Sequence, residues 1–207
     1  MNHDITNEVL AEFSTAFSSN PVNRIAMNAV TSAGLLAASK NPMAQRESRH
    51  SYSISLEQGE ITNQKQSGRC WMFAALNTFR FEVMKNLNLK TFELSQNYTL
   101  FYDKLEKSNY FLESILETLD QPTQGRLISF LLSAPLGDGG QWDMLCNLVR
   151  KYGVVPKEAM PETVSSSATR EMTSALTRKL REDACRLRKA YADGSTLDEL
   201  RQKKEAM

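Results

Sequence analysis

The chain of 207 residues has few of the residues that mark several specialised protein classes. Its three cysteines, at positions 70, 146 and 185, form neither an even disulfide set nor a spacing typical of metal ligands. A reduced, cytoplasmic compartment is therefore the simplest expectation, and no metal site is expected. Its longest apolar stretches, such as residues 34–38 and 130–132, are too short to cross a bilayer. A disulfide scaffold and a membrane-spanning protein are both excluded on these grounds.

Charge of a single sign is also absent. The 25 Lys and Arg residues nearly balance the 24 Asp and Glu residues, which leaves a net charge of +1. This balance argues against a dedicated nucleic-acid-binding protein. The first residues contain neither a basic region nor an apolar run, so no secretory signal is expected. With 41% hydrophobic and 24% charged residues, the composition is that of an ordinary globular protein.

The hydrophobic pattern predicts a mainly helical chain. Helices are expected over residues 5–17 and 22–30, followed by a polar loop over residues 39–53. Weak alternation over residues 52–60 indicates a short strand. Residues 70–87 are helical in propensity and apolar on nearly every side, so this helix is expected to be buried at the centre of the fold.

The second half of the chain has clear helix-start and helix-stop signals. Ser95 is placed to cap a helix whose expected buried stripe contains Leu94, Tyr98, Phe101, Tyr102 and Leu105. A helix over residues 141–152 should end at Gly153. A long charged helix is expected after Ser167, and the capping box of Thr196 and Glu199 starts another one.

The chemically informative segment is Thr62-Asn63-Gln64-Lys65-Gln66-Ser67-Gly68-Arg69-Cys70-Trp71. Cys70 opens the apolar helix, and the positive end of a helix dipole favours the thiolate, which is the nucleophilic form of cysteine. The Cys70 N–H and the Gln64 side-chain amide could both donate to an oxyanion formed at an attacked carbonyl. Gly68 would let the backbone turn so that Gln64 faces Cys70. Considered alone, a cysteine at a helix start is more often a small buried apolar residue.

This segment resembles the papain-like cysteine peptidases, and in particular the branch that contains bacterial aminopeptidase C and bleomycin hydrolase. Further stretches support the resemblance, in order along the chain: Asn20-Pro21-Val22-Asn23, Glu93-Leu94-Ser95-Gln96, Gly137-Asp138-Gly139-Gly140-Gln141-Trp142, Lys151-Tyr152-Gly153-Val154-Val155-Pro156 and Met160-Pro161-Glu162. The resemblance covers roughly residues 5–165 and is specific as a set.

The resemblance implies an α+β papain-like fold, represented here mainly by its helical lobe. It implies an N-terminal extension over residues 1–60, a lobe with the nucleophile over residues 61–165, and the truncated start of a helical insertion over residues 166–207. It further implies an N-terminal exopeptidase that acts on peptides without a cofactor and assembles as a hexamer. Cys70 would be the nucleophile, Gln64 would hold the oxyanion, and the backbone at Gly139 and Gly140 would approach the substrate.

The catalytic His and Asn of such enzymes lie about 130 to 150 residues after the Cys, and farther where a helical insertion intervenes. The two histidines of this chain, His3 and His50, both precede Cys70. His50 could act as the base only if its polar loop folded over Cys70. A catalytically inactive fragment, or a module for oligomerisation and interaction, is therefore the alternative to an active aminopeptidase. Cys146 and Cys185 are expected to be core or helix-surface residues.

Overall fold

The computed structural model describes residues 4–48, 51–56 and 59–207, which form two compact units, residues 1–55 and residues 56–207. The first unit contains four helices among its described residues: α1 (Asn7–Ser19), α2 (Pro21–Ala33), α3 (Leu35–Ala38) and α4 (Pro42–Glu47). Thr6 and Asn20 cap the first two helices through their side-chain oxygens, and Pro21 occupies the first turn of α2. The two helices predicted near the N-terminus are thus confirmed, with α2 longer at both ends.

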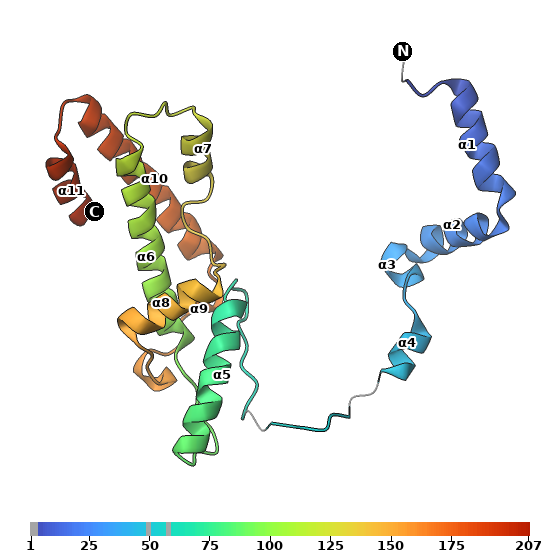
Figure 1. The fold of residues 1–207 in the computed structure, drawn as a ribbon, viewed down its shortest axis with the longest axis horizontal. Coiled ribbons are helices and arrows are strands. Elements are labelled where there is room, and N and C mark those ends of the chain that lie inside the picture. The colour runs from blue at the N-terminus through green and yellow to red at the C-terminus, as the bar shows by residue number, and fades with distance from the viewer. Residues whose placement is uncertain (1–3, 49–50, 57–58) are drawn as a thin grey trace. The chain divides into compact units, whose positions relative to one another are not determined.

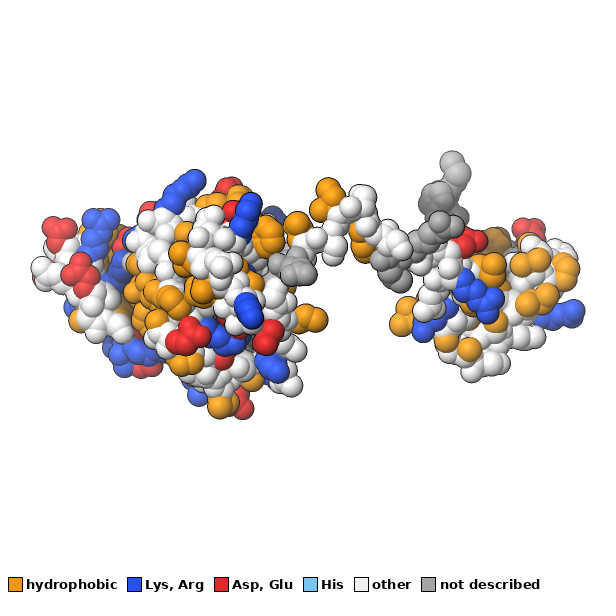
Figure 2. All heavy atoms as spheres, turned by 90° about the horizontal axis from the view of Figure 1, so that it is seen from below, with side chains coloured by type: hydrophobic (Ala, Val, Ile, Leu, Met, Phe, Trp, Pro, Cys, Tyr) orange, Lys and Arg blue, Asp and Glu red, His pale blue; other side chains and the backbone are white. Residues whose placement is uncertain are grey.

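None of the described residues of the first unit is buried. Its apolar side chains instead face outward, and those of Phe13, Ile25 and Leu36 are 59%, 68% and 82% exposed. Figure 2 shows hydrophobic side chains spread over the surface of this unit. The helices of residues 4–48 are amphipathic elements without an apolar core of their own within the unit.

The second unit contains the remaining elements (Figure 1): α5 (Cys70–Asn86), α6 (Gln96–Glu117), α7 (Arg126–Ser133), α8 (Trp142–Tyr152), the 3-10 turn η1 (Lys157–Ala159), α9 (Val164–Ser167), α10 (Arg170–Ala192) and α11 (Leu197–Glu205). Three of the helix-start and helix-stop signals expected from the sequence are present. Ser95 caps α6, Gly153 ends α8 with a φ of 74°, and Thr196 and Glu199 form the capping box of α11. Helix α7 was not predicted.

The core of the second unit lies along α6, which packs beside α10 (Figure 1). One cluster of buried apolar side chains joins the second half of α6 to α10 and α11; it includes Phe111, Ile115, Leu187 and Leu200. A smaller cluster joins α5, the start of α6 and α8 through Met72, Ala75, Leu100 and Leu145. Helix α6 therefore links the packing of the helix that carries Cys70 to that of the long helix α10.

The prediction that α5 is buried on every side was wrong. Met72, Leu76 and Arg80 are buried on one face, but Cys70 and Ala74 are exposed on the other. In the first half of α5 the exposed residues are Cys70, Ala74 and Thr78, whose small side chains explain why the sequence pattern showed no polar stripe there. The apolar composition of α5 therefore conceals a solvent-facing side that begins at Cys70.

The expected buried stripe at the start of α6 was also wrong in part. Phe101 and Leu105 are 53% and 50% exposed. The buried positions on this part of the helix include Asp103 and Lys104, which are 1% and 6% exposed. These two polar residues are buried because each forms an ion pair, with Lys107 and Asp138 respectively.

The described residues form no β-strand, so the strand expected over residues 52–60 is absent from the part of that segment which the structure describes. Among these residues, two isolated bridges join extended segments: Gln66 pairs with Ala168, and Leu94 pairs with Pro156. Across residues 4–48, 51–56 and 59–207, no helix combines the length and apolarity that a membrane span requires.

Candidate active site

Cys70 is the first residue of α5 and is exposed. Within the described part of the chain, no side chain caps the N-terminus of this helix. The first intrahelical bond of α5 is donated by the Phe73 N–H to the Arg69 carbonyl oxygen, over 3.0 Å. Cys70 therefore lies at the open, positively polarised end of a helix.

Arg69, the residue directly before Cys70, is completely buried. Its two terminal nitrogens each donate to a carboxylate oxygen of Glu162 over 2.8 Å, and its Nε donates to Ser67 Oγ over 2.8 Å. Its guanidinium also lies 5.0 Å from the centroid of the Phe73 ring. Each of the three guanidinium nitrogens donates a hydrogen bond, and the bidentate pair with Glu162 fixes the backbone that leads into Cys70.

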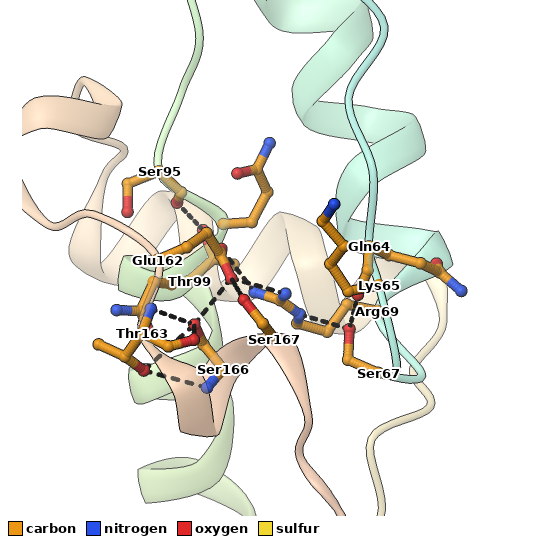
Figure 3. A network of polar contacts seen from close by, with 12 residues as sticks. Gln64, Lys65, Ser67, Arg69, Ser95, Thr99, Glu162, Thr163, Ser166 and Ser167 are labelled. Carbon is orange, nitrogen blue, oxygen red and sulfur yellow. Dashed lines mark hydrogen bonds and ion pairs between the residues drawn. The ribbon is translucent and has the colours of Figure 1, made fainter.

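Glu162 is held in turn by a group of hydroxyl residues (Figure 3). Ser166 Oγ donates to its carboxylate over 2.7 Å, and Thr163 and Ser166 form the capping box of α9. Burial alone would raise the pKa of Glu162, but the hydrogen bonds from Arg69 and Ser166 lower it below the ordinary value. The ion pair with Arg69 therefore remains charged at neutral pH.

Asp138 connects the Cys70 loop to two other helices. Its Oδ2 accepts the Gly68 N–H over 3.0 Å and the hydroxyl of Thr169 at the start of α10, and its Oδ1 accepts from Lys104 Nζ over 2.6 Å. Its backbone oxygen accepts from Trp71 Nε1 over 2.9 Å. Asp138 thus holds the loop before Cys70, the helix after it, α6 and α10 against one another.

These contacts control the ionisation of Asp138. Partial burial favours the neutral acid, but the hydrogen bonds from Lys104, Thr169 and the Gly68 N–H, together with the Lys104 charge, favour the carboxylate more strongly. They lower the pKa of Asp138 to about 2. The carboxylate is consequently ionised at every pH at which the protein would normally be studied.

At two glycines of this site, another side chain lies closer to the backbone than a Cβ atom would permit. A Cβ added at Gly68 would lie 2.7 Å from Asp138 Cβ, and one added at Gly140 would lie 2.5 Å from Trp71 Cζ2. Gly68 does not have a positive φ, so its part in the structure is to make room for Asp138. Gly139, by contrast, has no atom within 4 Å of an added Cβ and is exposed.

The structure places the other predicted residues as follows. Gln64 is half-buried, its carbonyl oxygen accepts from Ser67 Oγ over 2.6 Å, and its side-chain amide points away from the Arg69–Glu162 pair (Figure 3). Cys185 is exposed and Cys146 is half-buried. His3 and His50 lie outside the described residues. The roles of Cys70, Gln64, Gly139 and Gly140 in catalysis and substrate binding remain predictions.

The residues that build the site were not predicted from the sequence; they are Arg69, Asp138, Glu162 and the α6 lysines Lys104 and Lys107. Asp138 lies in the motif of residues 137–142, and Glu162 lies in that of residues 160–162. The acidic residue in each motif was therefore the available signal. Among the described residues, no group of three or more His, Cys, Asp or Glu side chains is arranged to hold a metal ion.

Comparison with known proteins gives the family. The profile of the Peptidase C1-like family matches residues 4–207, and the chain therefore belongs to that family. The expected relationship to aminopeptidase C and bleomycin hydrolase is confirmed.

Among curated relatives, aminopeptidase C of Listeria monocytogenes is 48% identical over 193 residues, which cover 93% of this chain and 44% of the relative. Bleomycin hydrolase of Gallus gallus is 41% identical over 202 residues, with 96% and 44% covered. The crystal structure of PepW from Lactobacillus rhamnosis HN001 matches with a TM-score of 0.92 at 47% identity, covering all of this chain and 46% of that one. The chain thus spans a little under half the length of these relatives.

Proposed function

We propose that residues 1–207 form the nucleophile-bearing part of a cysteine aminopeptidase. The observation that carries the proposal is the position of Cys70, exposed at the uncapped start of α5, in a chain of the Peptidase C1-like family. The curated relatives named aminopeptidase supply the reaction class, the removal of N-terminal residues from peptides. The proposed enzyme is cytoplasmic, uses no cofactor and assembles as a homo-oligomer.

In the proposed reaction, the Cys70 thiolate attacks the carbonyl carbon of the first peptide bond. The N–H of Cys70 and the side-chain amide of Gln64 donate hydrogen bonds to the oxyanion that forms. The amine leaves with a proton from a general acid, and the acyl group remains on sulfur as a thioester until water hydrolyses it. The backbone at Gly139 and Gly140 binds the peptide alongside.

The base and the Asn that orients it come, in this proposal, from outside residues 1–207, since His3 and His50 both precede Cys70. The buried pairs described above leave the Cys70 loop already formed: Arg69 is fixed by Glu162, and Gly68 by Asp138. The backbone that leads into Cys70 is therefore held in place before the remaining groups are added.

Cys185 offers a matched control for the nucleophile, because it is also exposed and lies on a helix. We expect chloroacetamide to alkylate Cys70 at least about tenfold faster than Cys185 in the same molecule at pH 6, with peptide mass spectrometry following each cysteine. The two cysteines differ in position, since Cys70 is the first residue of α5 whereas Cys185 lies inside α10. Equal rates at the two cysteines would contradict an activated nucleophile.

Hydrolysis of an aminoacyl amide is the second test of the proposed function. We expect the 207-residue chain alone not to hydrolyse an aminoacyl amide. A chimera that continues into the remainder of the Listeria relative should hydrolyse it, with activity lost in Cys70→Ala and kept in Cys185→Ala. Hydrolysis by the 207-residue chain alone, lost in Cys70→Ala, would show that the base lies within it and would make His50 the next residue to change.

A second candidate is a module for oligomerisation without catalysis. The specific observation in its favour is the outward-facing apolar surface of the first unit. This candidate predicts that the chimera remains inactive while the 207-residue chain self-associates. Activity of the chimera that depends on Cys70 would exclude it.

A further inference from the structure

The three carbonyl oxygens of residues 137–139 each accept a hydrogen bond from a side chain of α5 or α6. Lys107 Nζ donates to the first of these oxygens over 2.9 Å and to the third over 2.7 Å. Lys104 Nζ donates to the first over 2.9 Å, and Trp71 Nε1 donates to the second over 2.9 Å. Every one of these carbonyls is thus directed toward side chains of α5 and α6.

Lys107 is the main anchor because all its donors are used. An ammonium group has three donors, and Lys107 directs one to Asp103 over 2.9 Å and the other two to the loop carbonyls. The Lys107 side chain is 15% exposed and that of Asp103 is 1% exposed. Burial and the ion pair with Asp103 hold the Lys107 side chain in place. Its Nζ also lies 5.6 Å from the centroid of the Trp71 ring.

The direction of the carbonyls fixes the direction of the N–H groups. In a trans peptide, the C=O of one residue and the N–H of the next point in opposite directions, and no cis peptide bond occurs among the described residues. Drawing the carbonyls of residues 138 and 139 inward therefore turns the N–H groups of Gly139 and Gly140 outward. Within the described part of the chain, neither N–H donates to a protein acceptor.

We propose that Lys107, assisted by Lys104, is a positioning residue for peptide binding: it holds the loop carbonyls inward so that the Gly139 and Gly140 N–H groups face the substrate backbone. This inference rests on the proposed function, since it takes the glycine loop to be part of the substrate site. The ligand class it implies is a peptide whose backbone carbonyl accepts from the loop. Lys107 does not touch the reacting atoms and acts through the loop.

Alkylation of Cys70 in the 207-residue chain tests this role. An N-chloroacetyl dipeptide amide, the dipeptidyl reagent, and chloroacetamide both form a bond from the sulfur to carbon with loss of chloride. Only the first has a peptide backbone, and that backbone follows the reacting group, as it follows the first peptide bond of an aminopeptidase substrate. We expect Lys107→Met to lower the preference for the dipeptidyl reagent about tenfold, as loss of well-oriented hydrogen bonds should. The rate with chloroacetamide should stay within about twofold of the unmodified chain.

Lys151→Met is the matched control, because Lys151 is a solvent-exposed lysine that pairs with Glu106 and has no bond to the loop. The double variant Asp103→Asn with Lys107→Met guards against unfolding, since it leaves no unpaired buried charge. We expect reagent preference to be kept in the control and lost in both Lys107 variants.

A folded Lys107 variant that keeps the full preference for the dipeptidyl reagent would overturn the positioning role. Equal loss of reactivity toward both reagents would also overturn it, because that result indicates a general effect on Cys70. If the unmodified chain shows no preference for the dipeptidyl reagent, the role of Lys107 in peptide binding is refuted. The proposed function is decided separately, by whether the chimera hydrolyses an aminoacyl amide in a Cys70-dependent way.

Discussion

Gly140→Ala should destabilise the second unit because no room exists for a methyl group. A Cβ at this position would lie 2.5, 2.6 and 2.7 Å from three atoms of the Trp71 indole, against about 3.5–4.0 Å for ordinary carbon contacts. The indole would have to move by about 1 Å, and it is held by the hydrogen bond from Nε1 to the Asp138 carbonyl oxygen over 2.9 Å.

The expected cost follows from these two effects. Overpacking of a well-filled site typically costs about 1–3 kcal/mol. Loss of the indole hydrogen bond adds about 1 kcal/mol. We therefore expect the free energy of unfolding to fall by about 2–4 kcal/mol, which lowers the urea midpoint by about 1 M or more for a typical urea dependence.

Gly139→Ala is the matched control, one residue earlier in the same loop. No atom lies within 4 Å of the added Cβ, and Gly139 does not have a positive φ. Its expected effect lies between zero and about 1 kcal/mol of stabilisation, through the unfolded chain. Urea unfolding followed by far-UV circular dichroism measures both variants. If the two alanine variants unfold at the same urea concentration, the close packing of Gly140 against Trp71 is refuted.

The remaining predictions concern charges and the exposed first unit. Glu162→Gln should lower the free energy of unfolding, measured in urea, by about 3 kcal/mol, because Arg69 is left buried without its ionic partner. Glu158→Gln, at an exposed position of η1, should leave that free energy unchanged. Asp138→Asn should make the free energy of unfolding depend less on pH in acid. The pKa of Asp138 is about 2 in the folded protein, below the value of about 3.9 in the unfolded chain. The carboxylate therefore stabilises the protein fully above about pH 4 and loses that effect as the pH falls toward 2. Self-association, measured by light scattering against the monomer mass of 23.4 kDa, should weaken in Phe13→Asp, since Phe13 is 59% exposed on α1.

Each of these outcomes can fail in a recognisable way. Equal stabilities of Glu162→Gln and Glu158→Gln would show that the buried guanidinium does not depend on its carboxylate partner. An unchanged acid profile in Asp138→Asn, measured by urea unfolding between pH 3 and 5, would contradict the lowered pKa. A monodisperse monomer before any substitution would remove the case for association through α1.

The sequence predicted the helices of the second unit well where local chemistry sets their ends. Ser95 caps α6, Gly153 closes α8, and Thr196 pairs with Glu199 at the start of α11, as expected from the residues alone. These signals work because the donor and acceptor lie within four residues of each other. The failed strand prediction over residues 52–60 relied instead on weak alternation, which no neighbouring strand supports in the described residues.

By itself, the sequence determined the family and the position of Cys70 at a helix start, since both depend on residue types at fixed spacing. Only the tertiary structure decided which polar residues are buried. Asp103 and Lys104 lie on the inner face of α6 because their partners, Lys107 and Asp138, hold the glycine loop against that face. Pairs such as Arg69 with Glu162 and Gly68 with Asp138 join residues far apart along the chain. No local period encodes such pairs, because their energy arises only when the folded chain excludes water from both partners.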